Sequence, residues 1–326
     1  MSYSFLFRCF VCAAITIVAS SSPCFSNKVR GYSPLFSELY GPDGRLAMVA
    51  IRGFHLQDGE YRLAVDPLTM RTAVVPAARW REKRSGLDEL RRLLRRLPYF
   101  RAIAAAEQNR RVIQNAGITR LSSRVQAVYV TADLCPSRRP LDRRLIQLLL
   151  DAGGGDARPV PIALCVSGRW MDKHKADLDW LIEREKKHEI AVTWVNHSYH
   201  HRCNKKGPCR SNFMLMKGTK VEEEVLTMEA RMIERCIVPS VFFRFPGLIS
   251  DEALVRTIIG YGLIPLGADA WLGKKHMPSA GSIILVHANG EEPVGIDRLN
   301  TFLRSRKNGQ PPLRDIRDGF AECFAP

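Results

Sequence analysis

The chain has 326 residues, of which 46% are hydrophobic, and its formal net charge at pH 7 is +16. This length and composition support a large buried core, so they exclude a chain that is disordered throughout. The positive charge favours anionic partners such as cell-envelope polymers or membrane surfaces, although arginines that merely solvate helices give the same total. Nucleic acid is not an expected partner, because the sequence carries no recognisable nucleic-acid-binding module.

Residues 1–26 have the layout of a secretory signal. One cation, Arg8, precedes an apolar run from Cys9 to Ala19, and small residues lead to an expected cleavage near Ser26. The run is shorter than the roughly 20 apolar residues that cross a bilayer, so we expect no stable membrane span after cleavage. An uncleaved anchor is the alternative. The segment predicts a periplasmic or secreted protein.

Of the nine cysteines, three lie in this segment, which leaves six in the rest of the chain. An even number of cysteines in an exported protein permits disulfides. The stretch CNKKGPC favours a bridge between Cys203 and Cys209. Gly207 and Pro208 supply a turn that brings the two Cα atoms within the roughly 4.4–6.8 Å that a disulfide requires.

Residues 27–123 predict a small N-terminal extension made of a β meander and basic helices. Apolar and polar residues alternate between Arg45 and Arg79, with a turn signal at Asp58 and Gly59. The period then becomes helical in SGLDELRRLLRRL, where Ser85 is the expected N-cap. The apolar stripe of this helix consists of Leu87, Leu90, Leu94 and Leu97, and Arg91, Arg92, Arg95 and Arg96 lie mostly away from it.

Residues 124–310 alternate between apolar strands and helices, and residues 311–326 are expected to form a C-terminal tail. Strands that are apolar on both faces and separated by helices predict a parallel sheet or barrel, an α/β fold. The expected strands cover 125–133, 159–168, 189–196, 239–245, 264–269 and 281–288. The expected helices cover 140–153, 175–188, 222–236, 251–262 and 295–306.

Polar residues end several of these apolar runs. In parallel folds the carboxyl ends of the strands meet at one edge, where the chemistry gathers. We therefore expect the side chains that end the runs to converge, and these are Asp133, His197, Arg244, Asp269 and His287.

Three histidines follow the strand 189–196 within five positions. His197 and His201 are four residues apart, so one turn can direct both imidazoles at a single ion. His200 is the alternative partner at three residues, and a hydrogen-bonded structural cluster is the alternative to a metal site. The placement after a strand favours the metal site.

Six short motifs resemble the polysaccharide deacetylases, also called the NodB-homology group or carbohydrate esterase family 4. NHSYHH resembles the family's Asn-His-Ser/Thr-x-x-His, and VYVTADLCPS is similar to its Thr-x-Asp-Asp-Gly-Pro strand end. IALCVSGRW resembles the strand that follows, FFRFPG resembles Arg-x-Pro-x-Gly, GADAW the Asp/Trp motif and IILVH the closing Leu-x-His. All of them occur in the family's order across residues 124–305.

The resemblance implies a distorted (β/α) barrel and a divalent metal ion, usually zinc. It implies a hydrolase that removes the N-acetyl group from an N-acetylhexosamine in a polysaccharide, and the positive net charge favours an anionic envelope polymer as that substrate. It also implies a role for each matching position. These are Asp133 as catalytic base, His197 and His201 as metal ligands, Arg244 as the tether of the base, Asp269 as the carboxylate that orients the acid, and His287 as the general acid.

The chain departs from the family where two adjacent aspartates are usual, because it has Leu134 after Asp133. A leucine cannot coordinate a metal. Three repairs stay open: Asp133 is itself a ligand, Cys135 supplies a thiolate, or the site has lost its metal. We favour Asp133 as the ligand and regard Cys135 first as a structural cysteine.

Two aromatic residues near the predicted site, Tyr199 and Trp271, are candidates for stacking on sugar rings, although aromatic side chains more often belong to the core. Arg244, Asp269 and His287 have a structural alternative too, as strand-end residues with ordinary hydrogen bonds. At the level of the whole protein, the alternatives are a catalytically silent glycan-binding protein on the same fold and a related amidase that acts on a small molecule.

Overall fold

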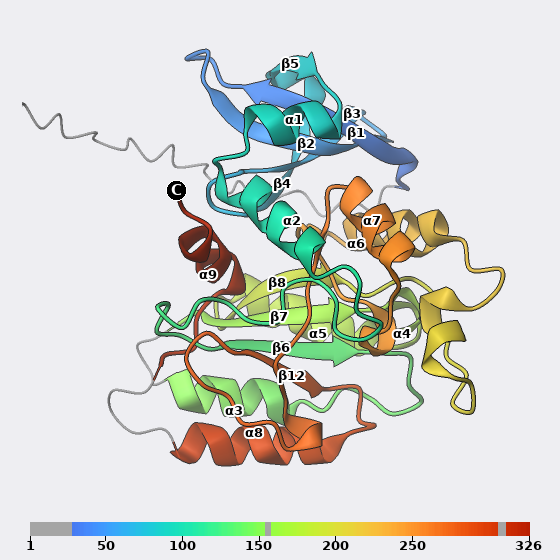
Figure 1. Ribbon diagram of the computed structural model, residues 1–326, viewed down its shortest axis with the longest axis vertical. Coiled ribbons are helices and arrows are strands. Elements are labelled where there is room, and N and C mark those ends of the chain that lie inside the picture. The colour runs from blue at the N-terminus through green and yellow to red at the C-terminus, as the bar shows by residue number, and fades with distance from the viewer. Residues whose placement is uncertain (1–27, 154–157, 306–310) are drawn as a thin grey trace, which may run out of the picture.

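The computed structural model describes residues 28–153, 158–305 and 311–326 (Figure 1). The expected signal, residues 1–26, lies outside the described residues. Within the described part, no helix combines the length and the apolar character needed to cross a membrane.

The N-terminal extension is a five-stranded antiparallel sheet with two helices. Its strand order is β4-β3-β2-β1-β5. The sheet is larger than the predicted meander because β1 begins at Arg30, well before Arg45. Three register shifts against β2 interrupt β1, and such bulges hide the alternation that identifies a strand in sequence. The strands are β1 (Arg30–Tyr40), β2 (Leu46–Leu56), β3 (Gly59–Val65), β4 (Thr72–Pro76) and β5 (Arg81–Arg84).

The predicted basic helix is shorter than its leucine pattern, because α1 covers only Leu87–Leu93, and a second helix, α2 (Pro98–Gln108), begins beyond the predicted stretch. Pro98 is the first residue of α2, where its missing N–H costs nothing. The expected N-cap is wrong by one residue: Gly86 caps α1, and the Ser85 hydroxyl lies 3.4 Å from Glu38 Oε1 instead. The leucine stripe packs on the core as predicted.

The second part of the chain is a distorted (β/α) barrel, as predicted. Its seven strands pair in parallel in the order β10-β9-β8-β7-β6-β12-β11, and in the described residues the edge strands β10 and β11 do not pair with each other. The strands are β6 (Tyr129–Leu134), β7 (Val160–Val166), β8 (Ile190–Asn196), β9 (Phe242–Phe243), β10 (Ile264–Pro265), β11 (Ala270–Trp271) and β12 (Ile283–His287).

Helices follow the strands and bury the outer face of the sheet in a second apolar cluster (Figure 1). Between β8 and β9 the chain forms a π-helical turn, Glu223–Thr227, that runs directly into α6. The helices are α3 (Arg144–Gly153), α4 (Gly168–Lys173), α5 (Lys175–Lys186), α6 (Met228–Glu234), α7 (Glu252–Gly260) and α8 (Pro293–Ser305).

The expected C-terminal tail is instead a packed helix, α9 (Ile316–Cys323). Asp315 caps it by accepting a hydrogen bond from the N–H of Arg317 at 2.8 Å. Phe320 is fully buried, and its ring lies 4.7 Å from that of Phe242 in β9. The apolar residues of this helix therefore complete the core of the barrel.

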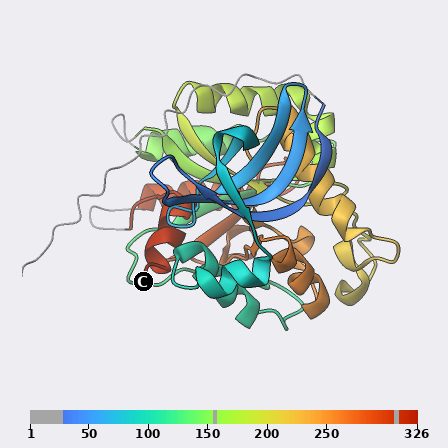
Figure 2. The same ribbon diagram turned by 90° about the horizontal axis from the view of Figure 1, so that it is seen from above.

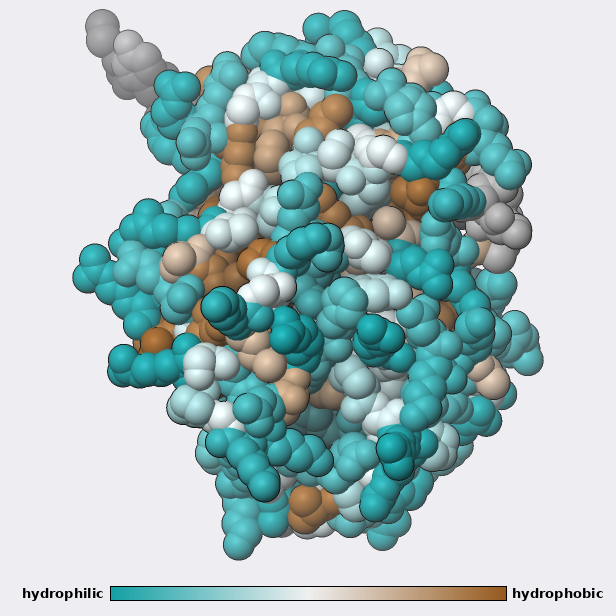
Figure 3. All heavy atoms as spheres, turned by 90° about the vertical axis from the view of Figure 1, so that its right-hand side faces the viewer, coloured by the Kyte–Doolittle hydropathy of each residue, from teal (hydrophilic) through white to brown (hydrophobic). Residues whose placement is uncertain are grey.

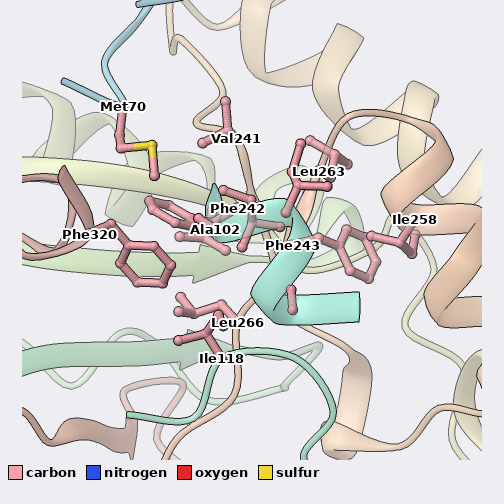
Figure 4. Close-up of a cluster of buried hydrophobic side chains, with 14 of the residues drawn as sticks. Met70, Ala102, Ile118, Val241, Phe242, Phe243, Ile258, Leu263, Leu266 and Phe320 are labelled. Carbon is pink, nitrogen blue, oxygen red and sulfur yellow. The ribbon is translucent and has the colours of Figure 1, made fainter. Parts of the chain in front are cut away.

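The extension and the barrel share one core. The extension lies over one side of the barrel (Figures 1 and 2), and Figure 4 shows Met70 and Ala102 beside the barrel residue Phe242. A buried ion pair joins the same two parts, with Arg52 Nε of β2 at 2.7 Å from Glu229 Oε2 of α6. The extension is therefore an integral part of the folded protein.

Candidate metal and catalytic site

Strand register brings the first residues of the site together. His287 at the end of β12 pairs with Asp133 in β6. Side chains alternate along a strand, so Leu134 points away from Asp133 and is completely buried in the cluster beneath the outer helices. Cys135 is the next residue on the side of Asp133. The alternation explains how a residue two positions beyond Asp133 reaches the site.

The turn after β8 holds the histidines in a strained backbone. Ser198 and His201 both have positive φ, 65° and 47°, a conformation that costs non-glycine residues about 1–3 kcal/mol and gathers at functional sites. Asn196 stabilises the turn by accepting from the N–H of Ser198 at 3.0 Å and donating to the carbonyl of Val225 in the π-helical turn. Tertiary contacts thus hold both histidines in place.

His200 belongs to the scaffold of this turn. Its Nδ1 lies 3.0 Å from Glu224 Oε1, and its backbone N–H donates to the other oxygen of the same carboxylate. The alternative that His200 replaces His201 as a metal donor is therefore excluded by the geometry of the described residues.

Three donor atoms converge at the carboxyl ends of β6 and β8. The Nε2 atoms of His197 and His201 are 3.2 Å apart, and Cys135 Sγ is 3.5 Å from His197 Nε2. The donor atoms of Cys135, His197 and His201 all lie within 4.8 Å of one another. A tetrahedral zinc ion places two nitrogens about 3.3 Å apart and a nitrogen and a sulfur about 3.6 Å apart, given its usual bond lengths. The three side chains fit such an ion.

The protonation of His197 agrees with this role. Its Nδ1 lies 2.8 Å from the backbone carbonyl of Arg244, which can only accept, so Nδ1 carries the proton. Nε2 is then the ring nitrogen that faces Cys135 and His201. A carbonyl that fixes the tautomer in this way is the usual outer support of a metal-binding histidine.

The donor set bears on the third ligand. Asp133, the favoured prediction, lies outside the group of three, but its Oδ2 is 3.6 Å from His197 Nε2, so its role as a ligand stays a prediction. Within the group of three, the third donor is the thiol of Cys135. Its backbone is fixed because Asn289 donates to the Cys135 carbonyl at 3.2 Å and Ser167 donates to the carbonyl of Leu134 at 2.9 Å.

The surroundings favour the thiolate form of Cys135. Burial by itself raises the pKa of the thiol, but the charge of His201 and hydrogen bonds with His197, His201 and His287 outweigh it and lower the pKa well below its usual value. The thiolate is the form that binds metal ions.

Arg244 tethers Asp133. Both side chains are almost fully buried, and Arg244 Nη1 lies 3.3 Å from Asp133 Oδ1. The other terminal nitrogen of Arg244 donates to Thr131 Oγ1 at 3.0 Å and to the carbonyl of Gly267 at 3.2 Å. These contacts hold one carboxylate oxygen and leave Oδ2 directed toward the histidines.

The partner of His287 is Glu292, which corrects the role expected for Asp269. His287 Nδ1 lies 2.9 Å from Glu292 Oε2, and Trp271 Nε1 donates to the same oxygen at 3.1 Å. The oxygens of Asp269 instead accept from Arg120, from Ser282 Oγ and from the N–H of Ile283. Asp269 therefore connects neighbouring segments and has no contact with the acid.

The pair with Glu292 favours the imidazolium form of His287. Burial alone lowers the pKa of the ring, but hydrogen bonds to Cys135 and Glu292 raise it well above its usual value. His287 is thus suited to donate a proton near neutral pH.

The two aromatic candidates differ in their surroundings. Trp271 lies beside the acid, its ring centroid 5.5 Å from that of His287, and the ammonium of Lys274 lies 3.8 Å from its centroid. The hydroxyl of Tyr199 donates to Asp172 Oδ2 at 2.7 Å, and its ring lies so close to Gly168 that a Cβ there would stand 2.1 Å from it. Sugar stacking by these residues stays a prediction.

The predicted disulfide is not formed in the structure, where Cys203 and Cys209 are exposed, free thiols. The loop between them is closed by an amide side chain instead. Asn212 donates to the carbonyl of Asn204 at 2.7 Å and accepts from the N–H of Asn204 at 2.9 Å. These bonds set the loop geometry without a sulfur bridge.

No family model matches the chain. Several solved structures are similar to it at low identity. A family 4 carbohydrate esterase from Bacillus anthracis is 16% identical with a TM-score of 0.48, covering 66% of this chain and 89% of that one. PdaA from Bacillus subtilis, a family 4 carbohydrate esterase, is 16% identical with a TM-score of 0.45, covering 65% and 94%.

A third similar structure is wild-type BA3943, a pseudoenzyme of the same CE4 family from Bacillus anthracis. It is 16% identical with a TM-score of 0.44, covering 63% of this chain and 69% of that one. These proteins belong to the family that the six sequence motifs resemble. Because the identities are low, the activity of this chain is inferred from the side chains of its own site.

Proposed function

We propose that the protein is a metal-dependent hydrolase that removes N-acetyl groups from an N-acetylhexosamine-containing polysaccharide. The observation that carries the proposal is the convergence of three metal donors between a tethered carboxylate and a carboxylate-paired histidine. Cys135, His197 and His201 supply the donors, Asp133 the tethered carboxylate and His287 the paired histidine. The sugar substrate rests on the ordered motifs of residues 124–305.

Cys135, His197 and His201 would hold a divalent ion, and zinc suits their two nitrogens and one sulfur. When bound, such an ion supplies Lewis-acid chemistry, which polarises a carbonyl oxygen and makes water more acidic. An amide needs this help because neutral water attacks its carbonyl very slowly.

The remaining residues handle protons. Asp133 accepts the proton of the attacking water at Oδ2, the oxygen that Arg244 Nη1 does not hold. His287 donates a proton to the departing amine nitrogen, and Glu292 holds the imidazolium by its Nδ1. Each transfer contributes roughly 10²–10⁴-fold to the rate, as is typical of general acid–base groups.

Acetate release from N-acetylglucosamine oligomers tests the proposal. The purified protein is assayed after chelation and again after addition of zinc. We expect release with zinc and none after chelation, and a Cys135→Ser variant loses both bound zinc and activity. Full activity without metal would contradict the proposal. Zinc-loaded protein that binds the oligomers without releasing acetate would instead favour the catalytically silent glycan-binding protein.

Cobalt substitution tests the thiolate ligand without relying on turnover. Cobalt bound by a thiolate has an intense sulfur-to-metal charge-transfer band in the near ultraviolet. We expect this band in the wild-type protein and its loss in Cys135→Ser, whereas a Cys165→Ser control keeps it because Cys165 is not among the three donors.

We also propose that the enzyme acts outside the cytoplasm, on the evidence of the signal layout in residues 1–26. A fusion of residues 1–40 to a reporter that is active only after export tests this. Export is expected, and replacing the apolar run with charged residues abolishes it. An inactive reporter on the unaltered fusion would contradict the proposal.

A further inference from the structure

A cleft of about 870 Å³ borders the candidate site and is lined mainly by charged side chains. Helix α4 (Gly168–Lys173) forms one wall, and this side of the molecule faces the viewer in Figure 3, where hydrophilic residues are abundant. Five of the lining residues are cations, namely Arg138, Arg139, Arg169, Lys173 and Lys205.

The cleft lies next to the site along the chain. Pro136 and Ser137 line the cleft and directly follow Cys135. Glu291 lines it and directly precedes Glu292, the partner of His287. This proximity makes the cleft the place for a sugar next to one held at the donor cluster.

The cations of the cleft exceed its carboxylates. Five cations and two carboxylates, Asp172 and Glu291, leave a formal charge of +3. Asp172 is already engaged by the Tyr199 hydroxyl at 2.7 Å and by Arg231, which lies outside the cleft lining, at 3.0 Å. Glu291 accepts from Ser137 Oγ at 2.9 Å.

None of the five cations forms an ion pair within 4.0 Å among the described residues, although the charge of Arg169 helps to lower the pKa of Asp172. Arg139 donates to the carbonyl of Gly290 at 2.9 Å. Elsewhere many surface arginines do pair, as Arg144 does with Asp142. Like charges that face one cleft repel each other, so an anion bound there relieves the repulsion.

The wall that carries two of these cations is held in position. The buried Ser137 Oγ accepts from the N–H of Arg139 at 2.9 Å, and the carbonyl of Ser137 lies 3.0 Å from His174 Nε2. The opposite wall is tied to the histidine turn, because the N–H of Arg169 donates to the carbonyl of Tyr199. The cations are therefore presented from fixed backbone on both sides.

We propose that this cleft binds an anionic group on the sugar next to the one that is deacetylated, so the substrate is an acidic N-acetylated polysaccharide. The inference rests on the proposed function for the position of the acetylated sugar. A carboxylate of an acidic sugar and a sulfate or phosphate ester offer the same chemistry to arginine, which binds both through paired hydrogen bonds.

Binding of defined oligosaccharides tests the inference. Calorimetry compares three probes of equal length: a neutral N-acetylglucosamine oligomer, an oligomer that alternates N-acetylglucosamine with glucuronate, and a sulfated N-acetylglucosamine oligomer. We expect an acidic probe to bind at least about tenfold more tightly than the neutral one, with an advantage that shrinks as salt screens the charges. Which acidic probe gains affinity identifies the anion.

Matched triple variants locate the effect. Replacing Arg138, Arg169 and Lys173 by Gln removes the preference for the acidic probe. Replacing Arg92, Arg95 and Arg96 on the extension by Gln changes the net charge equally and keeps the preference. Both variants are compared by melting temperature and zinc content. Equal affinity for neutral and acidic probes, or an equal loss in the two triple variants, would overturn the inference.

The same experiment separates the two proposals. Tight, salt-sensitive binding of an acidic probe without acetate release would contradict the proposed function and support the anionic site. Equal acetate release from neutral and acidic probes, with no dependence on Arg138, Arg169 and Lys173, would support the function and contradict the anionic site.

Discussion

Two buried charged clusters serve the molecule in different ways. Between the extension and the barrel, each guanidinium nitrogen of Arg52 donates to an acceptor: both oxygens of Glu229 and the carbonyls of Ile51 and Tyr261. The hydroxyl of Tyr32 completes the set by donating to Glu229 at 3.0 Å. Every charge in this cluster is satisfied within the protein.

At the strand ends the arrangement is different. Two histidine nitrogens and one sulfur converge across 3.2–3.5 Å. Donor atoms of these types at this spacing suit a shared metal ion as their common partner. The contrast distinguishes a charge cluster that stabilises the fold from one that prepares a reaction.

The largest expected effect comes from removing one of the three metal donors at the strand ends. His201→Ala removes a donor atom, so we expect bound zinc to fall from one ion per chain to well below one and acetate release to fall by at least about 10³-fold. Metal analysis and the acetate assay measure both. His200→Ala is the matched control, because its imidazole binds Glu224, and it keeps its zinc. Unchanged zinc in His201→Ala would remove this residue from the site.

The charge cluster between the extension and the barrel is tested by its contribution to the free energy of unfolding. Arg52→Ala leaves Glu229 buried without its cation, and we expect the free energy of unfolding to fall by about 3–5 kcal/mol. Denaturant unfolding measures the change. Arg45→Ala is the control, since its ion pair is largely exposed and such pairs contribute at most about 1 kcal/mol. Equal small effects of the two variants would mean that the extension folds without the buried pair.

A smaller effect is expected from the carboxylate that pairs with His287 beside the three metal donors. Glu292→Gln removes the charge that supports His287, so we expect kcat to fall by no more than the roughly 10²–10⁴-fold that a general acid supplies. The carboxylate raises the pKa of His287. Its loss therefore moves the fall of activity on the alkaline side to lower pH.

The control for Glu292→Gln is Asp269→Asn. The Asp269 carboxylate bonds to Arg120 and Ser282 and not to the acid, so Asn there leaves the alkaline limb in place. Glu292→Asp should restore part of kcat. A shifted pH profile in Asp269→Asn, with none in Glu292→Gln, would reinstate Asp269 as the supporting carboxylate.

The smallest effect concerns the loop next to the cleft. Cys203→Ser replaces an exposed, free thiol, so we expect a change in the free energy of unfolding within about 0.5 kcal/mol under oxidising conditions. Thermal unfolding of both proteins with and without reductant measures it. A loss of about 2–5 kcal/mol that reductant reproduces in the wild-type protein would show that the bridge to Cys209 forms after all.

Much of the fold follows from local patterns, whereas the site depends on details that these patterns hide. Continuous apolar runs predict the parallel strands, and the polar residues that end them predict Asp133, His197 and His287 at one edge. Cys135 carried a usable signal, because it lies two positions beyond Asp133 on the same face of the strand. Only the folded structure shows that its sulfur reaches His197.

Glu292 carried no comparable signal. It lies five residues after His287 in a loop, where no period relates one side chain to another, and Glu291 beside it is equally acidic. The prediction that Asp269 supports His287 was wrong for a related reason. Asp269 ends an apolar run as expected, but its carboxylate forms an ion pair with Arg120, which lies far away in the sequence. Pairings between loops and remote residues are set by tertiary packing, which a single sequence does not encode locally.

The shared core has a practical consequence for anyone who shortens this protein. A recombinant chain begun at residue 124 would keep every residue of the site and still expose the face of Phe242 and Phe243 that Met70 and Ala102 help to cover (Figure 4). It would also lack Arg52, the buried ion-pair partner of Glu229. The motifs begin at residue 124, but a fragment that starts there would expose part of the core. A minimal catalytic fragment therefore has to begin near residue 28.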